Sequence, residues 1–424
     1  MELPGAIGLV GDGRPDPKGD WWSAYLVGER PAPVAEPASD RPLRAVDLFC
    51  GTGGLALGVA QLAAELGVRM VTEMVADSDA EAVAVYAANH DTRLRCIKSV
   101  SSLLDYRVRG RSADAGFVYP PEIVDPGLAE AVGGVDVVMA GPPCQGHSNL
   151  NNRTRRSDRR NTYYLTVPAF AVAASARMAI IENVPEVEHD DRQVVEVAQR
   201  LFEAAGYGVV RGTLRADAMG WPQTRRRSFL VARRDAAPIP LDVVAEALAD
   251  AGPRTLEWAI GDLTDREDCG IMDVASEMSP ENRERVDWLF DNGEYDLPNA
   301  WRPECHRDGT TYGSVYGRMW PDKPAPTITT GFMTPGRGRY VHPTRRRTLT
   351  PREAARIQGF PDTYRFVADP RHPPSRAKLA KWIGDAVPMP LGYGAALSAL
   401  GPGLDATGGS GSSGGTDSDT HLDN

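Results

Sequence analysis

Cys144 stands in the tetrapeptide Pro-Pro-Cys-Gln, residues 142–145, directly after the apolar run 136–140. Such a run predicts a buried strand, and open α/β sheets bind their ligands at the carboxyl ends of strands. A cluster of arginines follows, and neighbouring cations lower the pKa of a thiol toward the reactive thiolate. A lone cysteine is more often a small apolar filler of the core. Three further segments favour a nucleophile instead.

A glycine-rich turn is the first of these segments. It separates the apolar residues 44–49 from a predicted helix at 55–66, and its Gly51 and Gly53 would let the backbone approach a ligand closely. Asp77 closes the next apolar stretch and suits the hydroxyls of a ribose. A turn of this kind can also be mere strand-to-helix geometry. The absent third glycine of a dinucleotide fingerprint favours a nucleoside cofactor other than NAD.

The other two segments supply a carboxylate and two guanidinium groups. Glu182 ends the apolar strand predicted at 178–182, and a buried carboxylate there would have a raised pKa and could donate a proton near neutrality. Arg225 and Arg227 lead into the strand predicted at 228–232, and strand alternation places them on one face. Two guanidinium groups beside a catalytic edge could hold an anionic or carbonyl oxygen.

Taken together and in this order, the segments resemble the DNA cytosine-5 methyltransferase family. The glycine-rich, Pro-Cys-Gln, Glu-Asn-Val and Gln-x-Arg-x-Arg motifs of that family correspond to residues 47–55, 142–145, 182–184 and 223–227. Further similarity lies in residues 347–361 and 384–388, so the resemblance covers roughly residues 43–400. Six motifs in one order are highly specific.

The resemblance implies a covalent mechanism. The Cys144 thiolate would add to carbon 6 of cytosine, and the resulting enamine would attack a methyl group. Glu182 would donate a proton to N3, while Asn183 would brace the catalytic loop. Arg225 and Arg227 would stabilise the ring oxygen O2 and orient Glu182. The implied methyl donor is S-adenosylmethionine, and no metal is expected.

The resemblance also implies which residues bind that donor: Phe49, Gly51, Gly53, Leu55, Asp77, Ser78, Ser99, Pro142, Asp385 and Val387. Two of them depart from the family pattern. Ser99 offers a hydroxyl where many members have an aspartate near the adenine amine, and Asp385 stands where many have an asparagine. An aspartate near the sulfonium would favour a cationic donor and disfavour one with an additional carboxylate. Ordinary methyl transfer is therefore expected.

A double-stranded DNA substrate implies that the target cytosine leaves the helix, because a stacked base cannot present its ring face to a thiol. The loop after the nucleophile would contact phosphates through Arg153, Arg155 and Arg156. A second basic region contains Arg337, Arg339 and residues 345–347. Side chains that read base edges are expected within 236–340, where the candidates by residue type are Arg307, Tyr312, Tyr316, Arg318 and Trp320.

Composition agrees with this interpretation without requiring it. The chain has 424 residues, of which 42% are hydrophobic and 25% charged, which is typical of a globular protein large enough for two cores. Its formal net charge of −10 argues against a general nucleic-acid coat, so locally clustered arginines must bind DNA. Five cysteines without a Cys-x-x-Cys pair favour neither a zinc site nor a disulfide framework.

Alternating apolar strands and helices predict an α/β fold, a doubly wound Rossmann-like methyltransferase sheet with a smaller target-recognition domain. We expect a Pro-rich extended arm at 1–42 that docks by its tryptophans, a catalytic S-adenosylmethionine-dependent domain at 43–234 and a target-recognition domain at 235–375. Residues 376–402 should return to the catalytic domain and cover the cofactor cleft, followed by a disordered tail at 403–424.

The sequence shows no signal peptide and no apolar run of bilayer length, so we expect a cytoplasmic monomer that associates with the nucleoid when bound to DNA. A restriction-modification system, a phage-defence cluster and a solitary enzyme would all need the same active site. Two other functions remain open. A tRNA cytosine-5 methyltransferase is disfavoured by the long region after residue 235 and the arginine-rich loop. A non-catalytic regulatory subunit is disfavoured because Cys144 and Glu182 are both present.

Overall fold

A seven-stranded sheet organises the larger part of the computed structural model, which describes residues 17–29, 41–143, 159–250, 252–266, 270–307 and 314–401. The strand order is β10-β11-β9-β8-β1-β2-β3. The strands are β1 (Leu43–Leu48), β2 (Met70–Asp77), β3 (Thr92–Ile97), β8 (Val137–Ala140), β9 (Met178–Asn183), β10 (Gly208–Arg215) and β11 (Arg226–Arg233). All strand predictions made from apolar runs therefore correspond to strands of this sheet.

The direction of the strands changes at one side of the sheet. β1 pairs in parallel with β2 and β8, and the parallel region extends to β3 on one side and β9 on the other. β11 runs antiparallel to both β9 and β10. The chain thus builds outward from β1 in two directions, which confirms the doubly wound α/β fold and creates a topological switch point between β1 and β8.

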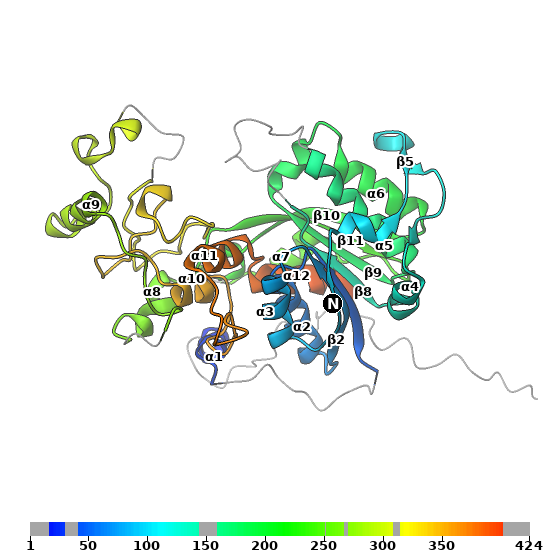
Figure 1. The fold of residues 1–424 in the computed structure, drawn as a ribbon, viewed down its shortest axis with the longest axis horizontal. Coiled ribbons are helices and arrows are strands. Elements are labelled where there is room, and N and C mark those ends of the chain that lie inside the picture. Colours follow the sequence, from blue (N-terminus) through cyan, green and yellow to red (C-terminus); the bar gives the residue numbers. More distant parts are fainter. Residues whose placement is uncertain are drawn as a thin grey trace, which may run out of the picture.

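Helices cover both faces of the sheet (Figure 1). One face packs against α2 (Gly54–Glu65) and α12 (Met389–Leu400), and the other against α5 (Thr166–Ala173) and α6 (Val194–Ala204). The alternation of strand side chains supplies both cores, since Ala45 faces the first layer and Val46 the second. The remaining helices of this sheet lobe are α3 (Ala80–Asn89), α4 (Pro126–Val132) and α7 (Leu241–Ala247). Two short ribbons, β4 (Leu104–Asp105) with β7 (Glu122–Ile123) and β5 (Val108–Arg109) with β6 (Gly116–Phe117), lie outside the main sheet.

The C-terminal helix α12 returns to the sheet lobe. Each of its residues is buried, and it lies so close to α2 that a Cβ at Gly392 would be 3.0 Å from the carbonyl oxygen of Leu55. Val387, two residues before the start of α12, lines the large pocket at the edge of the sheet. The return expected for residues 376–402 is seen for α12, whereas residues 376–385 pack into the core of the second lobe, and the residues before α12 reach the pocket.

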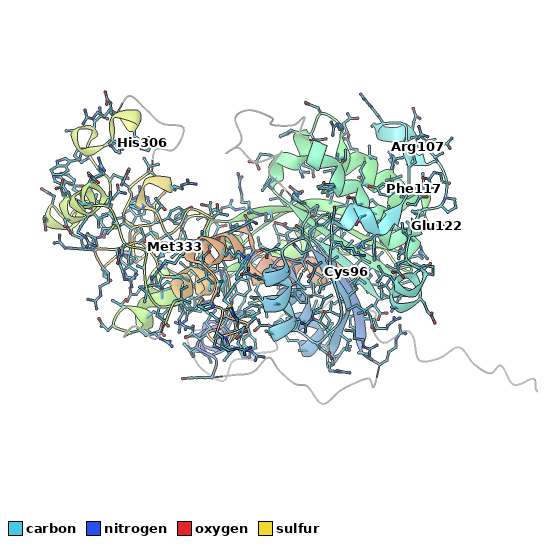
Figure 2. The ribbon with its side chains drawn as sticks, viewed as in Figure 1. Cys96, Arg107, Phe117, Glu122, His306 and Met333 are labelled. Carbon is cyan, nitrogen blue, oxygen red and sulfur yellow. The ribbon has the colours of Figure 1, made fainter. Side chains whose placement is uncertain are left out.

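A second lobe is formed by the described residues between 256 and 385 and lies to one side of the sheet (Figure 1). Its helices are α8 (Leu256–Ile260), α9 (Pro280–Asp291), α10 (Pro351–Ile357) and α11 (Arg376–Asp385). Figure 2 shows His306 and Met333 in this lobe, opposite Phe117 and Glu122 of the sheet lobe. The lobe has its own apolar core, which also takes in Ala82 and Val85 of α3. A capping box between Thr350 and Glu353 starts α10.

The expectation of an extended N-terminal arm is wrong for residues that form α1 (Pro17–Val27). Pro17 is the first helical residue, where a missing N–H costs nothing, so proline starts this helix instead of excluding it. Docking through a tryptophan is confirmed: Trp22 is buried and meets the ring of Trp221 edge-on, with 5.6 Å between centroids. The amide of Asp362 in the second lobe donates to the carbonyl oxygen of Leu26 at 2.8 Å.

Among the helices described, none combines the length and apolarity that a membrane span requires.

We expect Trp22→Ala to lower the free energy of unfolding by about 3 kcal/mol, because it leaves a cavity where α1 meets the core. Trp301→Ala is the control, since that side chain is 41% exposed and its loss should cost under about 1 kcal/mol. Urea unfolding measures both. Equal stability of the two variants would mean that α1 does not dock as described.

Candidate functional site

A pocket of about 630 Å³ opens at the carboxyl edge of the sheet, beside the switch point between β1 and β8. Its walls come from the turn after β1, the ends of β2 and β9, the segment after β8, and residues of the second lobe. The sequence-predicted donor residues that line it are Phe49, Gly51, Leu55, Asp77, Ser78, Ser99, Pro142, Asp385 and Val387. Residues that lie far apart in the chain are therefore gathered into one cavity.

The glycine-rich turn owes its shape to three residues with positive φ, namely Phe49 (55°), Gly51 (49°) and Gly53 (90°). Asp77 holds the turn, because one carboxylate oxygen accepts from the Gly51 amide at 3.0 Å and the other from the Asp79 amide at 2.9 Å. A Cβ at Gly51 would meet open space, whereas one at Gly53 would lie 2.7 Å from His90 Nε2. The structure thus places Gly53 behind the turn, against protein, although the sequence assigned it to the ligand.

Glu182 lies at the end of β9 and lines the same pocket. Its Oε1 is 2.8 Å from Nε of Arg227, and its Oε2 would be 3.5 Å from a Cβ at Gly141. Burial raises the pKa of Glu182 above the ordinary value, although the charges of Arg227 and Arg225 oppose that rise. A carboxyl group with these surroundings can hold a proton and release it within the pocket.

The two predicted arginines have different environments. Arg227 pairs with Glu182, whereas the fully buried Arg225 donates from Nη1 to the carbonyl oxygens of Ile328 and, at 3.1 Å, Gly384. Arg225 therefore joins β11 to the second lobe and to the segment that carries Asp385. Arg226 points away and is exposed, as strand alternation predicts.

The segment after β8 is described only as far as Pro143. Asn183 donates from Nδ2 to the carbonyl oxygen of Pro142 at 3.1 Å, so β9 holds this segment two residues before the predicted nucleophile. Cys144 lies outside the described residues, as do Arg153, Arg155 and Arg156. The thiol at Cys50 is buried beside the pocket, and burial raises its pKa, which makes it an unreactive alternative.

Several pocket residues escaped the sequence analysis. Lys381 and Trp382 of α11 line the wall near Asp79, whose carboxylate accepts from the Trp382 indole at 2.9 Å. Lys381 also pairs with Asp385 at 2.7 Å. Both residues lie on α11, and the pattern of apolar residues in that helix indicates which side is buried but not that the helix borders a pocket. Their proximity to the glycine-rich turn depends on how the second lobe folds back, which no local motif encodes.

The lining suits S-adenosylmethionine, which is an adenosine joined to a cationic sulfonium and an amino acid. Two buried polar atoms at the pocket, Asp47 Oδ2 near the end of β1 and Thr52 Oγ1 of the turn, have no hydrogen-bond partner among the described residues. Burial also raises the pKa of Asp47 well above its ordinary value. Buried polar groups normally find partners, so these atoms fit a site that a polar ligand completes. Asp77 and Asp385 add carboxylates that suit hydroxyls and a positive charge.

Arg318, one of the five candidates for base contacts, lies among aromatic rings of the second lobe. Its guanidinium is 4.0 Å from the centroid of Phe290 and donates from Nε to the carbonyl of Pro343 at 2.7 Å. Next to it, Tyr295 stacks on Trp320 with centroids 5.5 Å apart, and Arg339 covers the Trp320 ring at 3.9 Å. The stack leaves Arg318, Tyr295 and Trp320 half-buried and Arg339 buried, in a lobe with few regular elements.

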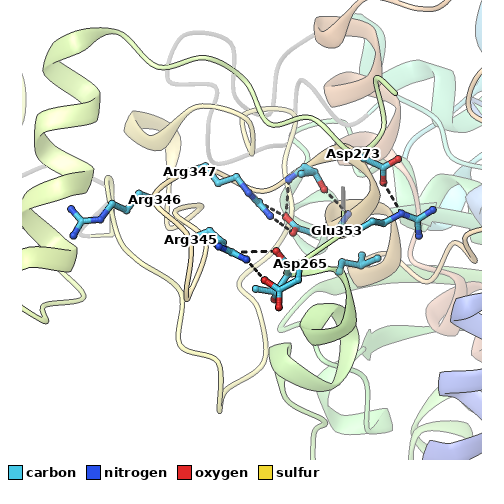
Figure 3. A pocket seen from close by; sticks show the side chains of 10 residues that line it. Asp265, Asp273, Arg345, Arg346, Arg347 and Glu353 are labelled. Atoms are coloured by element: carbon cyan, nitrogen blue, oxygen red, sulfur yellow. Dashed lines mark hydrogen bonds and ion pairs between the residues drawn. The ribbon is translucent and has the colours of Figure 1, made fainter. Parts of the chain in front are cut away.

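Part of the second predicted basic region, residues 345–347, lines a separate cavity of about 440 Å³ (Figure 3). These three arginines are paired with carboxylates: Arg345 with Asp265, Arg346 with Asp287 and Asp291, and Arg347 with Glu353. Burial raises the pKa of Glu353, but the hydrogen bonds from Arg347 and the nearby His342 ring, whose Nε2 is 3.4 Å from Oε1, outweigh it and bring the pKa to about 2. These three guanidinium groups are therefore paired with acids of the same lobe.

Comparison with known proteins gives a consistent result. The family model for C-5 cytosine-specific DNA methylase matches residues 43–398. The chain is 37% identical over 355 residues to the type II methyltransferase M1.BsuMI of Bacillus subtilis, covering 84% of this chain and 79% of that protein. It is 30% identical over 358 residues to the type II methylase M.HgiDII of Herpetosiphon aurantiacus, covering 82% of this chain and 92% of that protein.

Solved structures agree at the level of the fold. A putative DNA modification methyltransferase encoded within an E. coli prophage superimposes with a TM-score of 0.55 at 22% identity, over 84% of this chain and 97% of that one. The S. pombe Dnmt2 methyltransferase gives a TM-score of 0.53 at 16% identity, over 84% of this chain and 98% of that one. Since the family model spans most of the sequence, the chain belongs to the C-5 cytosine-specific DNA methylase family and is a DNA (cytosine-5) methyltransferase.

Proposed function

We propose that the chain transfers a methyl group from S-adenosylmethionine to carbon 5 of a cytosine that has swung out of double-stranded DNA. Cys144 would form a bond to carbon 6, and the electron pair of the ring would move toward N3, where Glu182 delivers a proton. Carbon 5 then attacks the methyl group. Loss of the carbon 5 proton, expulsion of the Cys144 thiolate and return of the N3 proton to Glu182 complete the reaction. The donor, when bound, supplies an electrophilic methyl group on a positively charged sulfur.

The observation that carries this proposal is the place of Glu182. This buried carboxyl group lines the donor pocket at the end of β9, and β9 also grips the segment that leads to Cys144 through Asn183 and Pro142. The proposed proton donor and the segment that leads to the proposed nucleophile thus lie at the same end of the pocket. Arg227 adds a guanidinium group beside that carboxyl, where it can orient it and meet an oxygen of the base.

We further propose that Phe49, Gly51 and Leu55 hold the methionine end of the donor, that Asp77 and Ser78 hold its ribose, and that Ser99 lies at its adenine. Contacts to DNA phosphates are assigned to Arg153, Arg155 and Arg156. Arg318 acts indirectly, by shaping the surface of the second lobe from within its stack. The setting we favour is a restriction-modification or phage-defence system, in keeping with the type II names of its relatives.

The decisive experiment combines labelled donor with either duplex DNA or tRNA, and compares the chain with Cys144→Ser. We expect methylation of duplex DNA alone, background activity in the variant, and a covalent adduct between wild-type protein and 5-fluorocytosine DNA detected by mass spectrometry. Methylation by Cys144→Ser at the wild-type rate would disprove the role of this thiol. Label on tRNA alone would reassign the substrate.

Glu182→Gln should lower kcat by about 10²–10⁴-fold while the donor still binds, because the amide cannot release a proton to N3. Burial raises the pKa of Glu182, so the wild-type carboxyl stays protonated to a higher pH than an exposed glutamate. The wild-type kcat should therefore fall as the pH rises through that raised pKa, and the variant should lack this limb. Glu122→Gln, on an exposed residue of β7, is the control. A wild-type pH profile retained by Glu182→Gln would exclude the assignment.

The negative charge of Asp385 should disfavour a donor whose transferred group carries an extra carboxylate, so we expect wild-type protein to form 5-methylcytosine. Lys381 and solvent screen that charge, since the Asp385 side chain is about half exposed. We therefore expect Asp385→Asn to improve binding of the carboxylated donor by no more than about fivefold, which corresponds to roughly 1 kcal/mol. Mass spectrometry of DNA nucleosides measures the product, and a carboxymethyl product from wild-type protein would contradict the inference.

A further inference from the structure

Two polar side chains support the glycine-rich turn from the side opposite the pocket. Tyr364, in the segment after α10, donates a hydrogen bond from Oη to the carbonyl oxygen of Thr52. His90, the residue that ends α3, lies with Nε2 3.2 Å from the same Oη. Both side chains occupy the space that a Cβ at Gly53 would need. Three distant segments of the chain thus meet behind one turn.

The direction of these hydrogen bonds follows from a count of hydrogens. A tyrosine hydroxyl has a single hydrogen, and here the Thr52 carbonyl receives it. In the tautomer with its hydrogen on Nε2, His90 donates to the tyrosine oxygen, and its ring also hydrogen-bonds to the backbone of Gly53. Burial lowers the pKa of His90 to about 4, so the ring is neutral at neutral pH and carries one N–H, which this arrangement uses. The chain of donors runs from His90 through Tyr364 to Thr52.

The ring of Tyr364 is held rigidly. It is buried in the core of the second lobe, with ring centroids 4.7 Å from Phe360 and 5.2 Å from Phe366. The amide of Asp362, two residues earlier, is fixed to α1 through Leu26. A hydroxyl on such a ring has little freedom to leave its partner, so the second lobe sets the position of the turn.

The other side of the same turn is the wall of the donor pocket, formed in part by Gly51, Thr52 and Gly54. The turn contains Phe49 at a φ of 55°. This conformation is unfavourable in free energy for any residue that has a side chain, and it persists only when the surroundings impose it. The hydrogen bond to the Thr52 carbonyl is one such constraint, applied at the centre of the turn. Without it a buried carbonyl oxygen would lose its partner and the turn could relax.

We propose that Tyr364, oriented by His90, is a positioning residue for donor binding: it holds the glycine-rich turn in the shape that accepts S-adenosylmethionine and so couples donor affinity to the second lobe. The inference rests on the donor pocket proposed above. It deepens that proposal by assigning a role to residues that do not line the pocket.

Tyr364→Phe tests the proposal because it removes one oxygen atom and keeps the ring. We expect the dissociation constant for S-adenosylmethionine, measured by isothermal titration calorimetry, to rise about five- to thirtyfold, the equivalent of one lost hydrogen bond with a buried acceptor left behind. The KM for DNA and the kcat at saturating donor should stay within about twofold. Tyr119→Phe is the matched control, because that exposed hydroxyl also donates to one partner, Asp105, and should leave donor affinity unchanged.

A pair of variants at His90 provides a second readout. His90→Gln can still donate to the tyrosine oxygen, whereas His90→Leu cannot, so the glutamine variant should retain more donor affinity than the leucine variant. Equal losses in both would overturn the role of His90. Wild-type donor affinity in a folded Tyr364→Phe, with only its melting temperature lowered, would show a merely structural contact and overturn the inference. Absence of donor binding by wild-type protein would overturn the donor site as well, which separates the two failures.

Discussion

The parallel pairing of β1 with β8 is the constraint on which the site depends. Its register sets Leu48 beside Ala140, so both strands end at the same level of the sheet. The chain leaves β1 toward α2 on one face and leaves β8 toward the opposite layer, and a crevice must form where the two paths separate. The glycine-rich turn forms one wall of this crevice. The segment that leads to Cys144 begins at the other.

Antiparallel β11 adds the charges that this crevice needs. Its pairing with β9 sets Phe229 opposite Glu182, and Arg227, which precedes Phe229 by two residues on the same face, then reaches the carboxylate. Burial and the guanidinium group shift the pKa of Glu182 in opposite directions, and burial prevails. The second arginine of the motif, Arg225, makes main-chain hydrogen bonds to the second lobe instead. The two arginines of one short motif therefore have separate roles: Arg227 influences the pKa of Glu182, and Arg225 connects the two lobes.

The sequence permitted the sheet, the turn and the clustering of the pocket residues to be predicted, because strands of apolar residues end in polar motifs at one edge. It did not permit the prediction of contacts between distant segments. Gly53 looked like a ligand contact, yet its space is filled by His90 and Tyr364, which lie far along the chain. The proline-rich composition around α1 suggested an extended arm, whereas a proline at the first helical position is compatible with a helix.

The same limitation applies to the basic residues, with a consequence for DNA binding. Arg345, Arg346 and Arg347 appear as a free positive cluster in the sequence, but each pairs with acids of the second lobe. A phosphate would have to displace those carboxylates, so these arginines add little net attraction for DNA. With an overall charge of −10, the protein must then rely on other cations, and the arginine-rich run that follows Cys144 is the densest in the sequence.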